Sequence, residues 1–288
     1  MNIIYSYTSG VKSVFYVKKI VFVIYLLNLI FALVVAIPFA SVLSTAIGFS
    51  DALTSLAVSF NYTAYADFMR EKGDALAGIF SVGRWLVPVY ILLQVFLNGG
   101  IIGAFSQDHE SYSLSNFYKN CTTYFWRYLK VFFGFLVFHI VAIMLIVIPL
   151  IIIFKGGIDE VESEITYWTA GYWVMGIYFI LFTLIMVVSD YTKILLTKDD
   201  SKGVFKTIFK AWKLVFQHLI KMYSLFLTNF LVIACFYWLY GKIGDGINPG
   251  SIGMAFVLIL IQQFFNIIRV YAKLTYYSSM IILTKGYN

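Results

Sequence analysis

The chain has 288 residues, of which 61% are hydrophobic and only 12% charged, and it carries a formal net charge of +7. Soluble domains average about 25% charged residues, so this composition excludes an ordinary soluble globular fold. Continuous apolar runs recur at the roughly 20-residue length that crosses a bilayer core, without the short alternating pattern of a membrane barrel. We therefore expect an all-α polytopic membrane protein with six transmembrane helices.

The first predicted span covers residues 20–43 and follows a basic segment with Lys12, Lys18 and Lys19. Because a cleavable signal peptide has an apolar core of only about 7–15 residues, we expect this span to remain in the membrane. Small side chains recur every four residues along one helix face, at Ala32, Ala36, Ala40 and Ser44. Such a stripe permits close helix approach, so we expect it to pack inside the bundle or, alternatively, against another subunit.

Residues 50–83 form a predicted outer loop, in which 62–72 suggest a short interfacial helix that is broken at Gly73. The second predicted span covers residues 85–105 and contains the motif NGGIIG at 98–103. A nucleotide-binding glycine motif would follow a strand, and none is predicted here. We therefore interpret Gly99 and Gly103 as sites of close helix packing.

The remaining predicted spans cover residues 131–154, 170–189, 222–241 and 252–271. Sixteen of the 21 basic residues fall in the segments on one side of these spans. Loops rich in lysine and arginine stay in the cytoplasm, so both termini are predicted to be cytoplasmic. The expected location is a bacterial inner membrane.

The chain reads as a single membrane domain, 1–288, built from three similar hairpin units at about 12–110, 111–200 and 201–288. Each unit has a basic amphipathic lead, a span, an outer loop and a second span. In the second and third leads, Lys119 corresponds to Lys210 and Lys130 corresponds to Lys221, with the same difference in residue number. Internal repeats of this kind are frequent in transporters, although duplication alone does not establish transport.

The segment SDYTKILLTKDDSKGVFKTIFKAWKLVFQHLIK at 189–221 places most of its lysines on one third of a helical wheel and its aromatic residues opposite. This pattern predicts a helix lying along the cytoplasmic interface, with lysines toward anionic phospholipid headgroups. Nucleic-acid binding is not expected, because a helix held flat on a membrane exposes only a narrow basic strip. The predicted interfacial residues are Lys202, Lys206, Lys210, Trp212, Lys213 and Lys221.

The run from Ser189 to His218 combines an Asp-Tyr pair at a span end, a basic turn and an amphipathic helix with a central tryptophan. It resembles a segment of the six-helix membrane region that precedes the catalytic domain in some bacterial glycerophosphodiester phosphodiesterases, and related stand-alone membrane proteins. The phosphodiesterase chemistry of that family belongs to a separate soluble barrel, which we do not expect within these 288 residues. The resemblance therefore implies a membrane module and carries over no catalytic residue.

Motifs for chemistry are absent from the sequence. Cys121 and Cys235 form no metal-binding pair, and the three histidines have no metal-ligand spacing. We therefore predict no catalytic residue, no metal and no cofactor; Asp190 with Lys193 is the nearest approach to an acid–base pair. Polar side chains within the spans suggest either a polar cavity or hydrogen bonds between helices, at Asn28, Asn98, His139, Asn229 and Asn266.

These observations favour a non-enzymatic accessory or scaffold subunit of a larger membrane assembly, with a membrane-protein partner or a second copy of the chain. The alternative is a transporter or flippase-like protein for a neutral or lipidic substrate. An embedded lipid enzyme is a third hypothesis, and it would require a cluster of Asp, Glu, His or Arg near one interface.

Overall fold

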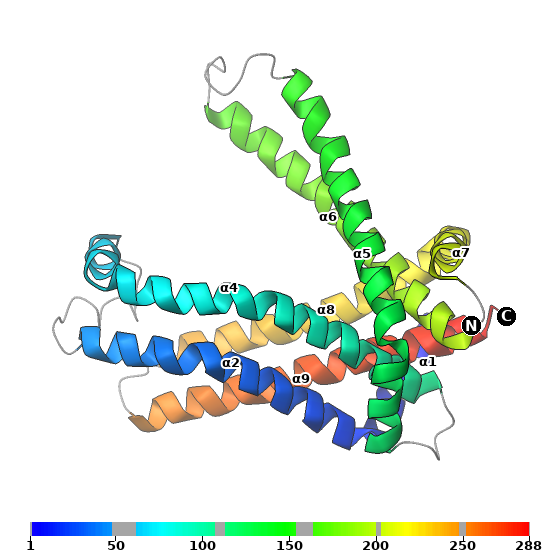
Figure 1. Ribbon diagram of the computed structural model, residues 1–288, viewed down its shortest axis with the longest axis horizontal. Coiled ribbons are helices and arrows are strands. Elements are labelled where there is room, and N and C mark those ends of the chain that lie inside the picture. Colours follow the sequence, from blue (N-terminus) through cyan, green and yellow to red (C-terminus); the bar gives the residue numbers. More distant parts are fainter. Residues whose placement is uncertain are drawn as a thin grey trace. The chain divides into compact units, whose positions relative to one another are not determined.

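The computed structural model describes residues 2–47, 62–106, 113–153, 164–199, 203–247 and 252–287, which are almost entirely helical and contain no strand. Six helices are long and apolar enough to cross a membrane, which confirms the predicted all-α membrane fold. The helices are α1 (Ile3–Tyr16), α2 (Lys18–Ile47), α4 (Tyr62–Ser106), α5 (Leu114–Ile153), α6 (Glu164–Lys198), α7 (Val204–Gln217), α8 (Leu219–Gly246) and α9 (Ile252–Lys285) (Figure 1).

The six long helices form three consecutive hairpins, α2–α4, α5–α6 and α8–α9, as the sequence predicts. The ends of the helices differ from the predicted spans. Helix α6 continues past residue 189 to Lys198, and α9 continues past residue 271 to Lys285. Both extensions bury apolar side chains against the protein, so they remain helical beyond the apolar runs that set the predicted ends.

The described residues divide into two compact units: an α2–α4 unit (residues 22–94) and a main unit (residues 1–21 and 95–288). Within the α2–α4 unit, Asn28 Oδ1 accepts hydrogen bonds from Tyr90 Oη at 3.1 Å and Gln94 Nε2 at 3.2 Å. The expected helix break at Gly73 is wrong, because α4 runs through this residue without interruption. One helical glycine costs only about 1 kcal/mol relative to alanine, which a long helix tolerates.

In the main unit, the N-terminal helix α1 packs closely on α9. Ser6, Gly10 and Ser13 lie on the buried face of α1. A Cβ added at Gly10 would collide with the Ser279 side chain and would lie 3.0 Å from the Thr275 backbone oxygen. The absence of a side chain at Gly10 therefore sets how closely the two helices approach.

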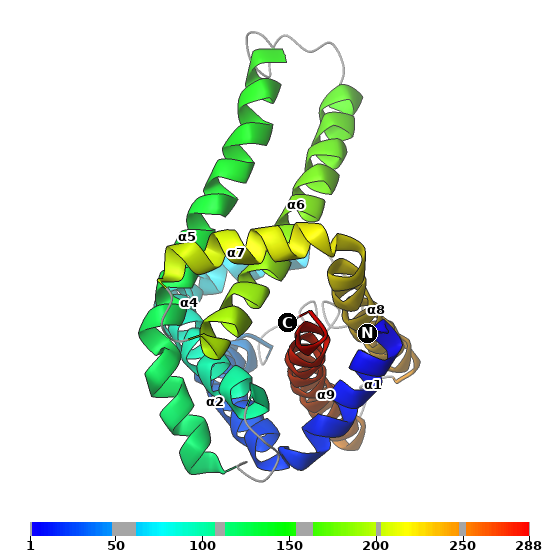
Figure 2. The same ribbon diagram turned by 90° about the vertical axis from the view of Figure 1, so that its right-hand side faces the viewer.

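Helix α7 lies across α5 and α6 and presents three faces (Figure 2). Ile208, Ala211 and Val215 are buried. Lys206, Lys210 and Lys213 are exposed along a second face, and Phe205, Phe209 and Phe216 are exposed as well. The apolar side predicted from the helical wheel thus divides into a face that packs on protein and an aromatic face that remains open.

Burial in the main unit is concentrated at one end of α6 and α9. We call residues 183–198 of α6 and 270–285 of α9 the inner halves, and residues 164–182 and 252–269 the outer halves. Most inner-half residues are buried, including Leu196, Leu274 and Leu283 at 0% exposure. Among the outer-half residues whose side chains are described, none is buried. The core of the main unit therefore lies where the predicted spans end.

Candidate functional site

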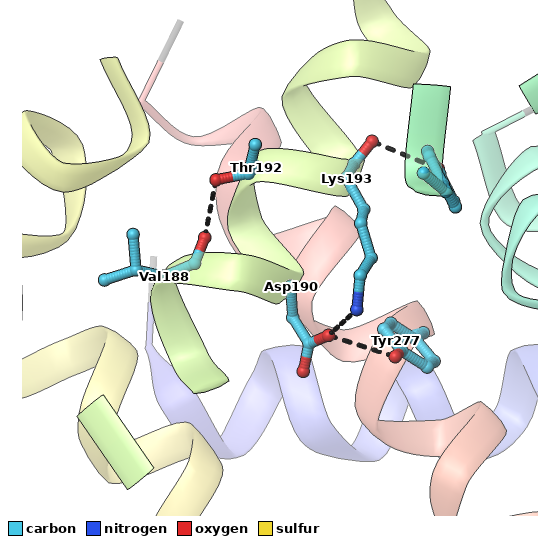
Figure 3. Close-up of polar contacts among 6 residues, drawn as sticks. Val188, Asp190, Thr192, Lys193 and Tyr277 are labelled. Atoms are coloured by element: carbon cyan, nitrogen blue, oxygen red, sulfur yellow. Dashed lines mark hydrogen bonds and ion pairs between the residues drawn. The ribbon is translucent and has the colours of Figure 1, made fainter. Parts of the chain in front are cut away.

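The inner halves of α6 and α9 enclose an ion pair. Asp190 Oδ1 accepts a hydrogen bond from Lys193 Nζ at 2.8 Å and another from Tyr277 Oη at 3.1 Å (Figure 3). Asp190 and Lys193 are three residues apart on α6, a spacing that brings side chains together on one helix face. Their side chains are only 9% and 14% exposed, so both charges depend on protein partners.

A second set of hydrogen bonds fixes the backbone around Lys193. Tyr128 Oη of α5 donates to the Lys193 carbonyl oxygen at 3.1 Å and lies 2.6 Å from Thr197 Oγ1. Thr192 Oγ1 donates to the Val188 carbonyl oxygen at 2.8 Å (Figure 3). Tyr277 of α9 bonds the ion pair itself and Tyr128 of α5 bonds the neighbouring α6 backbone, so α5 and α9 both contact this part of α6.

Positive charge predominates around this ion pair. Lys273 of α9 interacts electrostatically with Asp190, Lys193 and Arg269. These four side chains comprise three cations and one carboxylate. The carboxylate already accepts hydrogen bonds from Lys193 and Tyr277. The arrangement can hold helices together and attract an anion. The groups that bond Asp190 among the described residues are a lysine and a tyrosine, and their hydrogen bonds hold this carboxylate in place.

Metal binding finds no support in the described part of the chain, where no three His, Cys, Asp or Glu side chains are grouped closely enough to hold an ion. Cys121 is buried and Cys235 is exposed, and both are free thiols.

The predicted interfacial residues lie on or next to α7. Lys206, Lys210 and Lys213 are exposed on that helix, and Lys221 is exposed just after it on α8. Trp212 is partly buried and stacks on Phe216 at 5.4 Å between ring centroids. Lys202 lies outside the described residues. The spacing of Lys206, Lys210 and Lys213 places these three exposed lysines on one face of α7.

The residues predicted for a polar cavity belong to two units and to several helices. Asn28 belongs to the α2–α4 unit, where it bonds Tyr90 and Gln94. Asn98 is buried in α4, and its Oδ1 has no hydrogen-bond partner among the described residues. His139 of α5 contacts the Phe182 ring of α6 at 5.0 Å.

Asn229 and Asn266 also lie apart from each other. Asn229 of α8 accepts a hydrogen bond from Tyr7 Oη of α1 at 3.4 Å, and partial burial raises the pKa of Tyr7 above its ordinary value. The phenol therefore remains protonated and can donate. Asn266 instead lines a pocket of about 190 Å³ between α8 and α9. Gln262 and Arg269 line the same pocket, opposite Phe236, Tyr237 and Tyr240.

The residues predicted for helix packing fall into two groups. In α4, a Cβ on Gly103 would lie 2.6 Å from the Asn120 side chain, and one on Gly99 would lie 3.1 Å from the Asn120 backbone oxygen. These glycines therefore lie directly against α5. The stripe on α2 is exposed in the described structure, so its packing role stays a prediction; it comprises Ala32, Ala36, Ala40 and Ser44.

Sequence reasoning missed several residues of the buried cluster. Lys273 and Tyr277 follow the end of the predicted sixth span, and Tyr128 precedes the third, so all three were assigned to cytoplasmic segments. One available signal was the helical spacing of Gln262, Asn266, Arg269 and Lys273, which places four polar residues on one face of the C-terminal helix.

Comparisons of the chain with protein families, with curated proteins and with solved structures give no match. The resemblance to the membrane region of glycerophosphodiester phosphodiesterases therefore stays a prediction, and the interpretation of the site depends on its geometry.

Proposed function

We propose that this multi-pass membrane protein is a non-enzymatic accessory or scaffold subunit of a larger assembly in a bacterial inner membrane. Both termini lie on the cytoplasmic side in this proposal. The lysine strip of α7 contacts anionic phospholipid headgroups there, and the protein requires no cofactor and binds no nucleic acid. The partner is another membrane protein or a second copy of the chain.

The observation that carries this proposal is the exposed outer part of the α5–α6 hairpin. Figures 1 and 2 both show this part of the hairpin extending away from α8 and α9, which belong to the same unit. Among the described residues, the ring contact of α6 with another helix that lies nearest its outer end is between Phe179 and Phe230 of α8. The two ring centroids are 6.3 Å apart. Beyond it, Trp168, Tyr172 and Trp173 are each at least 67% exposed.

The same part of α6 has a hollow suited to a partner helix. Trp168, Gly171, Tyr172 and Met175 line a space of about 300 Å³. A Cβ added at Gly171 would meet no atom of the described residues within 4 Å. Membrane helices associate mainly by close packing, for which a glycine between large side chains leaves room. A second transmembrane helix fits this surface better than a soluble domain does, because the surrounding side chains are apolar.

A Gly171→Trp variant tests this proposal, because the added ring would occupy the hollow. After crosslinking in cells and purification in mild detergent, the unaltered protein should carry a stoichiometric partner. We expect Gly171→Trp to lower the recovered partner at least fivefold, a change equivalent to about 1 kcal/mol. The matched control is Gly241→Trp on α8, where added atoms also meet open space. Recovery of an uncrosslinked monomer alone would refute the scaffold function.

The alternative function, a transporter or flippase-like protein for a neutral or lipidic substrate, is favoured by one observation. The pocket between α8 and α9 combines aromatic walls with polar side chains inside an apolar span. A transporter must move its substrate across the bilayer, so reconstituted vesicles should exchange a fluorescent phospholipid between leaflets faster than protein-free vesicles. Equal exchange rates in the two kinds of vesicle would contradict the flippase function and leave the scaffold function as the proposal.

A further inference from the structure

One face of α9 carries a row of polar side chains through an otherwise apolar span. Gln262, Asn266, Arg269 and Lys273 are separated by four, three and four residues. At 3.6 residues per turn, this spacing places them within about 60° of one another and along about 16 Å of helix axis. Lipid chains offer no hydrogen-bond partner, so polar residues within a span commonly mark a ligand site or a pathway.

Three members of this row open into a pocket. Gln262, Asn266 and Arg269 line the space of about 190 Å³ between α8 and α9. Aromatic rings form its other walls, and Tyr240 of α8 contacts Phe265 of α9 at 5.1 Å between centroids. Sites that enclose a whole small molecule usually measure about 300–1,000 Å³. This pocket therefore suits one part of a larger ligand whose remainder stays in the bilayer.

Charge indicates which ligand the pocket selects. Arg269 makes no hydrogen bond or ion pair with any residue that the structure describes, and its electrostatic neighbour on α9 is the cation Lys273. Farther inward, the Asp190 carboxylate is already engaged by Lys193 and Tyr277. The end of the row that contains Arg269 and Lys273 thus has excess positive charge. The planar guanidinium of arginine presents paired donors that match the oxygens of a phosphate group.

We propose that the α8–α9 groove binds one anionic phospholipid. The lipid phosphate bonds Arg269, the ester oxygens face Asn266 and Gln262, and an acyl chain lies against the aromatic wall. This order matches the lipid's own chemistry, in which the charged group lies nearest water and the esters lie deeper. The site is distinct from the α7 lysine strip, which attracts headgroups in general from an exposed surface.

Native mass spectrometry of the full-length protein in mild detergent tests this inference. The probes are phosphatidylglycerol and phosphatidylcholine with identical acyl chains, each titrated separately. We expect one retained phosphatidylglycerol and weaker retention of phosphatidylcholine. Arg269→Gln should weaken phosphatidylglycerol binding about fivefold to tenfold, the effect of one lost charge contact. Arg269→Lys keeps the positive charge but loses the paired donors, so it should weaken binding less than Arg269→Gln does.

Two further variants keep the test decisive. Lys285→Gln removes a positive charge from the exposed inner end of the same helix, outside the pocket, and should bind phosphatidylglycerol normally. Ile233→Trp fills the pocket without changing its charge and should displace the lipid, and it decides the matter if Arg269→Gln does not fold. The inference is overturned if Ile233→Trp binds normally, if Lys285→Gln weakens binding as much as Arg269→Gln, or if both lipids bind equally.

Discussion

The inner and outer halves of α6 and α9 belong to the same continuous helices, yet they differ in how much of their surface is buried. The inner halves bury charged and aromatic side chains against neighbouring helices, and the outer halves leave Phe179, Ile180 and Phe256 more than half exposed. In lipid, an apolar side chain gains little from contacting another apolar side chain, so hydropathy alone does not bring helices together. In the inner halves, hydrogen bonds such as that of Tyr277 to Asp190 accompany the burial of apolar side chains such as Leu196 and Leu274.

The largest expected effect distinguishes the buried ion pair of the inner half of α6 from an exposed ion pair on α8. Asp190→Ala should lower the free energy of unfolding by about 3–5 kcal/mol, because it leaves Lys193 buried without its partner. The matched control is Asp245→Ala, which removes an exposed pair of the same spacing, 3.8 Å from Lys242 Nζ. That change should cost about 0–1 kcal/mol. Reversible unfolding in mixed micelles measures both values, and equal losses would contradict the contrast.

A smaller difference is expected between two glycines. Gly10→Ala should destabilise the protein by about 1–3 kcal/mol, because the new methyl group would collide with Ser279 of α9. Gly171→Ala on the outer half of α6 should leave stability unchanged or raise it by up to about 1 kcal/mol, since alanine favours a helix and the site is open. Melting in detergent, followed by size exclusion, ranks the two variants. A stabilised Gly10→Ala protein would show that α1 does not pack closely on α9.

The smallest expected effect lies where the inner and outer halves meet. Thr183 Oγ1 of α6 and Tyr223 Oη of α8 lie 2.8 Å apart and share a hydrogen bond. Hydrogen bonds between membrane helices contribute about 0.6 kcal/mol on average, so Tyr223→Phe should lower the melting temperature by about 1–2 °C. Tyr172→Phe on the exposed outer half of α6 serves as the control and should produce no shift. A shift as large for Tyr172→Phe would mean that its hydroxyl also has a structural role.

Hydropathy was sufficient to predict six spans and three hairpins, because each depends on the composition of one continuous segment. The inner core depends instead on contacts between distant segments. Asp190 and Tyr277 are 87 positions apart, and neither residue's local sequence indicates the other. The lysines that follow the predicted fourth and sixth spans also suggested exposed cytoplasmic segments. Lys193 is instead largely buried and paired with Asp190.

Helix α7 shows the same limit at smaller scale. Its lysine strip could be read from periodicity, and Lys206, Lys210 and Lys213 are indeed exposed. The wheel could not separate the apolar residues that pack on α5 and α6 from those that remain open, because Ile208 and Phe209 are equally apolar. Only the neighbouring helices decide that Ile208 is buried and Phe209 is 70% exposed.

The packing of α1 on α9 has a consequence for biosynthesis. The ribosome completes Gly10 long before it reaches Thr275 and Ser279, the residues that Gly10 meets. At about 5–20 residues per second, the intervening chain takes roughly 13–53 s to synthesise. During that interval the Ser6–Gly10–Ser13 face has no α9 to cover it. Helix α1 can therefore reach its final place against α9 only after α9 has been made.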